Sequence, residues 1–253
     1  MASSVIAAQL YTVREFTKTP TDIAQTLHKV REIGYEAVQV SAFGPIDKRE
    51  LRKLLDAEGL RCASTHIGFN EMRDETARVV EEHQILGCEY PAIGSMPKEY
   101  RNADGYHRFA REATEVAAKL AEHGLTFGYH NHSFELERYG GTTGLQILLD
   151  ESGPGVTFEI DTYWIQHGGG CPVQWIRRAA GRIPLLHLKD MTILDGKQAM
   201  AEVGEGNLDW PGILAAARDA GVVWYFVEQD TCQRDPFESL AISLRNLKKM
   251  GLK

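Results

Sequence analysis

The sequence predicts a single (β/α)8 barrel that occupies residues 1–253 as one domain. Three observations support this: the length of 253 residues, an alternation of strand-like and helical segments, and the absence of a phosphate-binding turn after the first strand. Barrels of this class typically have about 250 residues. The competing fold, an open doubly wound sheet, usually carries a glycine-rich turn there. Here the first strand runs into YTVREFTKTPTD, which has neither GxGxxG nor a P-loop.

Eight short apolar runs are the expected strands, at residues 5–11, 37–43, 61–68, 90–95, 125–132, 156–164, 184–190 and 224–230. Helical patterns separate them, as at 21–34, 47–59, 106–124 and 209–221. In the first helix the apolar positions fall at three- and four-residue steps on one face: Ile23, Leu27, Val30 and Ile33. Glycines predict helix ends at Gly34, Gly59, Gly124 and Gly221. Asp209, before Trp210 and Pro211, predicts a helix start.

Residues 190–208 form the longest segment without a clear helical or strand pattern. In a barrel, a long segment after a strand belongs to the catalytic face. We expect either a lid over the site or a plain surface excursion.

Composition narrows the class of protein. With 43% hydrophobic residues, 25% charged residues and a formal net charge of -7, an ordinary globular protein without a nucleic-acid or anionic-membrane partner is expected. No apolar run is long enough for a membrane span, and the start lacks the features of a signal peptide, so a cytoplasmic location is expected. The four cysteines are far apart and are expected to be reduced.

Ionisable residues gather at the expected strand ends, where barrel enzymes place their active sites. Alternation puts the two members of each of four pairs on one face of their strand: His130 with His132, Glu159 with Asp161, His187 with Lys189, and Glu228 with Asp230. Any single one of these residues could be a hydrogen-bonded residue of the core. Four neighbouring strand ends that all carry such residues are much harder to explain as core residues alone. Histidine and carboxylate ligands together suit Mn²⁺, Zn²⁺, Co²⁺ or Fe²⁺ better than Mg²⁺.

The order of the motifs QLYTVR, GYEAVQVS, YHNHSFE, EIDTYW, GRIPLLHLKD, VGEGNLDW and VEQD resembles the sugar phosphate isomerase/epimerase family with the xylose isomerase-like TIM barrel. The resemblance extends over nearly the whole chain. It implies a sugar substrate and one divalent ion held by His130, Asp161, His187 and Glu228. The oligomers that we consider are a homodimer and a tetramer. The chain departs from the family pattern at three positions: His130 replaces the glutamate of ketose epimerases, Gln39 a frequent glutamate, and Cys171 a frequent aspartate.

The resemblance implies that a proton leaves the carbon beside a carbonyl and that the metal stabilises the resulting enediolate. Glu228 is the first candidate for the acid/base, since a carboxylate has a second oxygen; the other candidates are Glu159, His132 and Lys189. His130 is a poor base if it binds the metal, and His132 is the alternative ligand. Residues expected to contact the sugar are His66, Tyr11, Phe69 and Trp164. Three alternatives stay open: a keto-inositol dehydratase-like lyase, an abasic-site endonuclease-like hydrolase and a sugar-binding barrel without catalysis.

Overall fold

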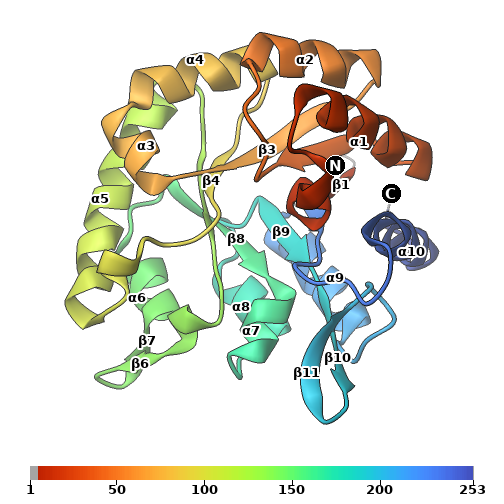
Figure 1. Cartoon of the computed structure of the whole chain (residues 1–253). Coiled ribbons are helices and arrows are strands. Elements are labelled where there is room, and N and C mark those ends of the chain that lie inside the picture. The colour runs from red at the N-terminus through yellow and green to blue at the C-terminus, as the bar shows by residue number, and fades with distance from the viewer. Residues whose placement is uncertain (1–4, 253) are drawn as a thin grey trace.

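Parallel strands close into a barrel in the computed structural model, which describes residues 5–252 (Figure 1). Within this range the barrel order is β1-β12-β9-β8-β5-β4-β3-β2. The predicted (β/α)8 fold is therefore confirmed. The barrel strands are β1 (Val5–Gln9), β2 (Ala37–Val40), β3 (Arg61–Ile67), β4 (Pro91–Ile93), β5 (Phe127–His130), β8 (Val156–Asp161), β9 (Leu185–Leu188) and β12 (Trp224–Val227).

Helices surround the strands, and two short antiparallel hairpins extend from the loops (Figure 1). The helices are α1 (Pro20–Ile33), α2 (Lys48–Ala57), α3 (Phe69–Asp74), α4 (Thr76–Leu86), α5 (Ala103–Ala121), α6 (Gly144–Glu151), α7 (Thr162–His167), α8 (Pro172–Arg178), α9 (Trp210–Ala220) and α10 (Pro236–Lys249). Shorter 3-10 turns are η1 (Leu10–Phe16), η2 (Lys98–Tyr100) and η3 (Phe134–Leu136). The hairpins pair β6 (Arg138–Tyr139) with β7 (Thr142–Thr143), and β10 (Asp190–Leu194) with β11 (Lys197–Ala201).

Local sequence signals set the helix boundaries. Helix α1 begins with a capping box between Thr19 and Asp22, and Gly34 ends it in the left-handed conformation at φ 108°. Its predicted apolar face is buried at Ile23, Leu27 and Val30. Gly221 likewise caps α9, Gly59 and Gly124 follow α2 and α5 with positive φ, and Asp209 caps the start of α9. These predicted boundaries are confirmed.

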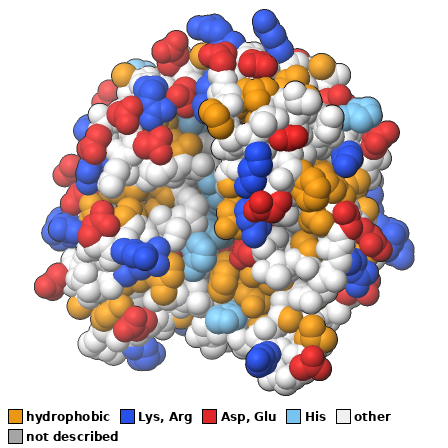
Figure 2. Space-filling model, viewed as in Figure 1, with side chains coloured by type: hydrophobic (Ala, Val, Ile, Leu, Met, Phe, Trp, Pro, Cys, Tyr) orange, Lys and Arg blue, Asp and Glu red, His pale blue; other side chains and the backbone are white. Residues whose placement is uncertain are grey.

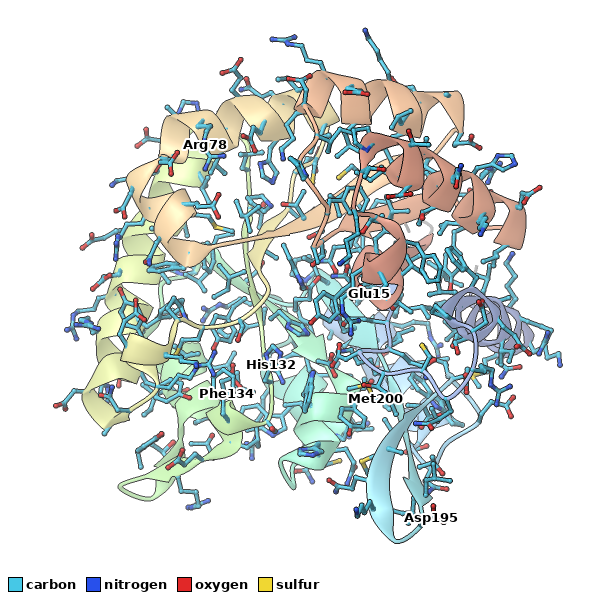
Figure 3. The ribbon with its side chains drawn as sticks, in the orientation of Figure 1. Glu15, Arg78, His132, Phe134, Asp195 and Met200 are labelled. Carbon is cyan, nitrogen blue, oxygen red and sulfur yellow. The ribbon has the colours of Figure 1, made fainter. Side chains whose placement is uncertain are left out.

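The segment 190–208 is more regular than its sequence suggested, because much of it is the β10–β11 hairpin. The turn is made by Asp195 and Gly196, both with positive φ, which is the conformation that tight hairpins require. Asp195 lies at the tip and Met200 at the base (Figure 3). The Met200 sulfur accepts the backbone N–H of Asp230 at 3.2 Å. The hairpin base is therefore attached to the chain just beyond β12.

One buried carboxylate fixes the chain beyond this hairpin. The carboxylate of Asp190 accepts a hydrogen bond from the indole N–H of Trp210 and from the backbone N–H groups of Met191, Gly204, Gly206 and Leu208. The loop between β11 and α9 is thus wrapped around a single anion directly after Lys189.

The barrel interior changes from apolar to polar along the strands. Its lower layer consists of Ala7, Ala37, Ala63, Leu185 and Phe226. Gly128 lies beside this layer. A Cβ added there would come within 2.8 Å of the Ala92 side chain, so the packing leaves no room for a larger residue. Since side chains two residues apart share a face, the next inward positions on β1 and β2 are Gln9 and Gln39, both fully buried. The fold therefore collects polar side chains towards the carboxyl ends of the strands.

Candidate metal centre

Four adjacent barrel strands carry the predicted metal ligands to one place. His130 and Asp161 end β5 and β8, His187 lies in β9, and Glu228 comes directly after β12. Register pairs Asp161 with His187, and Phe226, two residues before Glu228, also pairs with His187. One ligand atom from each of the four residues lies within 4.8 Å of the others, and all four side chains are buried.

The contacts within this cluster show which ligand atoms face inward. His130 Nε2 lies 3.2 Å from Asp161 Oδ2, and His187 Nδ1 lies 2.9 Å from Glu228 Oε2 and 3.6 Å from Asp161 Oδ2. The Nδ1–H of His130 donates to the carbonyl of Gly94 at 3.0 Å. Because a carbonyl only accepts, this bond leaves the lone pair on Nε2, which points to the centre.

These residues fit a divalent ion. Two donors bound to one ion at about 2.0–2.2 Å can be at most about 4.4 Å apart. A set of donor atoms within 4.8 Å therefore needs only a small contraction to share an ion. Two imidazoles with two carboxylates form a donor set suited to Mn²⁺, Fe²⁺, Co²⁺ or Zn²⁺.

Lys189 is the buried cation of the site. Its ammonium lies 3.1 Å from Asp161, 2.8 Å from Glu228 and 3.0 Å from Asp230. Burial alone would lower the pKa of Lys189, but the carboxylates raise it above its ordinary value. Burial would raise the pKa values of Asp161 and Glu228, yet Lys189 and the nearby histidines hold both below the usual range. Both carboxylates are therefore ionised, and Lys189 has no lone pair with which to act as a base.

The aromatic side of the site is formed by His132, Phe134 and Trp164. Figure 3 places His132 near the centre of the view with Phe134 beside it, and the two rings stack at 5.6 Å. Trp164 lies 5.2 Å from His132 between ring centroids. Burial, together with the charge of Lys189, lowers the pKa of His132 to about 2, so its ring is neutral. Figure 2 shows histidine side chains in the floor of a cleft on this face.

Two buried nitrogens beside the cluster have no hydrogen-bond partner among the described residues. They are Nδ1 of His132 and Nε1 of Trp164. Buried polar atoms almost always have partners. A polar ligand at this place would supply them.

Comparison with known proteins identifies the family. The model of the xylose isomerase-like TIM barrel matches residues 27–250. The chain belongs to this family. Rhizopine catabolism protein MocC of Rhizobium meliloti is 25% identical over 281 residues, which cover 91% of this chain and 82% of that protein. Inosose dehydratase of Geobacillus kaustophilus (strain HTA426) is 26% identical over 200 residues, which cover 66% of this chain and 61% of that protein.

A solved structure gives the same assignment. The sugar phosphate isomerase/epimerase from Parabacteroides distasonis ATCC 8503 superposes with a TM-score of 0.84 at 25% identity, covering 100% of this chain and 96% of that one. The family therefore contains enzymes, and its named members include isomerase/epimerases as well as a dehydratase. No helix in residues 5–252 combines the length and apolar character of a membrane span.

The remaining predicted site residues lie in different surroundings. Glu159 lies deeper in the barrel, where Gln39, His66 and His187 contact its carboxylate. Both ring nitrogens of His66 face protein atoms, those of Gln9 and Glu159. Tyr11 is half-buried in η1 under the guanidinium of Arg14. Phe69 is 1% exposed and packs on Tyr100, Phe109 and Phe127, so the fold takes it into the hydrophobic core and not to the cluster.

Sequence reasoning did not give Gln9 a role and treated Gln39 only as a departure from the family. A signal was available, because each is a lone amide in an otherwise apolar strand. Their partners lie on other strands, so only the closed barrel shows what they contact.

Proposed function

We propose that the protein is a metal-dependent isomerase or epimerase of a sugar or keto-sugar. The observation that carries this proposal is the buried cluster of His130, Asp161, His187 and Glu228 at the carboxyl ends of adjacent strands. Membership of a family with sugar isomerases and epimerases supports it. When bound, a divalent ion supplies Lewis-acid polarisation to a carbonyl and a neighbouring hydroxyl of the sugar.

Glu228 is the proposed acid/base. Its contacts with His187 and Lys189 both involve Oε2, and among the described residues Oε1 makes no hydrogen bond. One oxygen can therefore serve as a ligand while the other removes and returns the proton on the sugar carbon beside the carbonyl. Lys189 supports this role because it keeps the carboxylate ionised.

His132 and Trp164 are the proposed contacts for sugar hydroxyls. The Trp164 N–H can only donate, whereas a neutral His132 offers an acceptor or a donor at Nδ1, depending on its tautomer. A hydroxyl group can satisfy both atoms, since it donates one hydrogen bond and accepts others. A sugar is thus a suitable partner for the two unpaired nitrogens.

A dehydratase of a keto-polyol is the second candidate. It is favoured by the relative named inosose dehydratase and by the same first step, removal of a proton beside a carbonyl. The two reactions differ in their second step, because a dehydratase must also expel a hydroxyl group as water.

The test is incubation of protein loaded with Mn²⁺ or Zn²⁺ with a panel of ketopentoses, ketohexoses and keto-inositols in D₂O. The isomerase proposal expects deuterium at the carbon beside the carbonyl together with an isomeric sugar in the NMR spectrum. Loss of water and a new unsaturated ketone would favour the dehydratase. Binding of a metal and a sugar without exchange on any substrate would contradict both and indicate a sugar-binding barrel.

A further inference from the structure

The barrel contains a closed ring of hydrogen bonds directly beneath the metal cluster. Gln9 Nε2 donates to Gln39 Oε1 at 2.6 Å, and Gln39 Nε2 donates to Glu159 Oε1 at 2.7 Å. Glu159 Oε2 lies 2.7 Å from His66 Nε2, and His66 Nδ1 lies 3.2 Å from Gln9 Nε2. We call these four side chains the polar ring. They come from β1, β2, β3 and β8, and Gln9, Gln39 and Glu159 are fully buried.

The proton arrangement in the polar ring follows from its donors and acceptors. Glu159 accepts at both oxygens, so His66 must carry its proton on Nε2. The lone pair on His66 Nδ1 then accepts the second N–H of Gln9. Gln9 is held in this orientation because its own carbonyl accepts the backbone N–H of Tyr11 at 3.0 Å. Every donor meets an acceptor, and reversing one group would bring two donors together.

His187 joins the polar ring to the metal cluster. Gln39 Nε2 uses its two protons on Glu159 and Ser64, so Gln39 Oε1 faces His187 Nε2 at 2.8 Å and requires a proton there. Glu159 Oε1 lies 3.2 Å from the same nitrogen. The other nitrogen, Nδ1, faces Glu228 and Asp161.

We propose that Glu159 is a positioning residue which, through Gln39, keeps the proton of His187 on Nε2 and so reserves Nδ1 for the metal. This role rests on the proposed metal site but differs from proton transfer to a sugar. Groups that hold the far nitrogen of a histidine ligand typically change metal affinity by about 10- to 100-fold when they are altered.

The variant Glu159→Gln breaks the arrangement in either orientation of the new amide. If its NH₂ faces Gln39, that amide must turn and present its own NH₂ to His187, which then loses the proton from Nε2. If its NH₂ faces His66, that ring must move its proton to Nδ1, where it meets the NH₂ of Gln9. We expect weaker Zn²⁺ binding in the first case and a changed His66 tautomer in the second.

Exchanging the two groups should repair the ring. In Gln39→Glu/Glu159→Gln the carboxylate at position 39 accepts from Gln9, His187 and the new amide, and the amide carbonyl at 159 accepts from His66. The NH₂ at 159 replaces the oxygen that lay 3.2 Å from His187 Nε2, so the carboxylate at 39 becomes the acceptor for that nitrogen. Ser64 can turn its hydroxyl to the new carboxylate, because the Tyr90 carbonyl that it leaves still accepts the backbone N–H of Thr65. The double variant has the same net charge as the parent protein.

The experiment measures Zn²⁺ affinity by chelator competition and histidine tautomers by ¹⁵N NMR. If the NH₂ of the new amide faces Gln39, we expect Glu159→Gln to bind Zn²⁺ about 10- to 100-fold more weakly; if it faces His66, we expect the His66 proton to move to Nδ1. The double variant should return to the parent's affinity within an order of magnitude and to the parent's His66 tautomer. The matched control is Glu202→Gln, which alters a buried carboxylate bonded to Ser239 and should leave the affinity unchanged.

The NMR arm needs no metal. In the metal-free parent, His66 is expected to be protonated on Nε2 only, and a protonated Nδ1 would overturn the inference. Unchanged Zn²⁺ affinity together with an unchanged His66 tautomer in Glu159→Gln, or no recovery in the double variant, would also overturn it. A parent protein that binds neither Zn²⁺ nor Mn²⁺ would refute the proposed function and this inference with it. A parent that binds Zn²⁺ while Glu159→Gln keeps both the affinity and the His66 tautomer would refute this inference alone.

Discussion

Glu135 gives a prediction whose size can be worked out from the structure. Its side chain is fully buried, and its oxygens accept hydrogen bonds from the Tyr129 hydroxyl at 2.8 Å and the His132 backbone N–H at 2.9 Å. Burial raises the pKa of Glu135 from 4.5 to about 7, although these hydrogen bonds act in the opposite direction. The folded protein therefore binds a proton more tightly than the unfolded chain does.

The sign of the pH dependence is set by this raised pKa. The stabilisation from protonated Glu135 is complete below about pH 4.5 and is lost as the pH rises towards 7. A difference of about 2.5 pKa units, from 7 minus 4.5, corresponds to about 3 kcal/mol. Glu135→Gln has no carboxyl group to ionise, and the Tyr129 hydroxyl can accept from the new amide. We expect the unfolding free energy of the variant, relative to that of the parent, to rise by about 3 kcal/mol as the pH is raised from 4.5 to 8.

The assay is urea unfolding of parent and variant across this pH range in the presence of a chelator. Glu115→Gln, which removes an exposed carboxylate from α5, controls for the change in net charge. A stability difference between Glu135→Gln and the parent that stays constant from pH 4.5 to 8 would refute the reasoning.

Three further predictions concern the site and its support. In Glu228→Gln, assayed with saturating metal, kcat should fall about 10²- to 10⁴-fold; exchange of the sugar proton at the parent rate would contradict this. Lys189→Met leaves three carboxylates without their cation, so the free energy of unfolding of the metal-free protein should fall by about 3–5 kcal/mol. Added Zn²⁺ should restore a large part of this loss in urea unfolding, and equal losses with and without Zn²⁺ would show that charge is not the cause. Asp190→Asn replaces one carboxylate oxygen with an NH₂ group, which faces backbone N–H groups as a second donor. Amide hydrogen exchange at Gly204, Gly206 and Leu208 should therefore become faster. Unchanged protection would count against the role of Asp190.

The barrel was predictable because its signals are local and repeated. The apolar steps of α1, its closing glycine and the cap at Asp209 lie within a few residues of the helix ends that they set. The hairpin at 190–201 was missed as regular structure although Asp195-Gly196 is a strong turn signal. The whole segment 190–208 was instead interpreted as irregular, either a lid or a surface excursion.

The candidate site was predictable to the level of strand ends but not of contacts. Alternation placed His130, Asp161, His187 and Glu228 on inward faces, and the fold brings them together. It also placed Glu159 with Asp161, yet the two occupy different depths, and Glu159 contacts partners from β2, β3 and β9. Phe69 was expected to contact the sugar only because its position resembles those at the mouth of such barrels. Which side of the barrel wall such a residue occupies depends on helix packing, which has no local signal.

The order in which the chain supplies these residues has a consequence for biosynthesis. The ligands come from residues 130–228, whereas Gln9, Gln39 and His66 come from the first strands. Strand β1 pairs with β12, so the sheet closes only when the end of the chain returns to its beginning. Every residue up to Glu228 must therefore be synthesised before the ion can have all four of its ligands. The full ligand set is therefore available only late in synthesis, and the ion cannot bind all four side chains while only the first strands have been made.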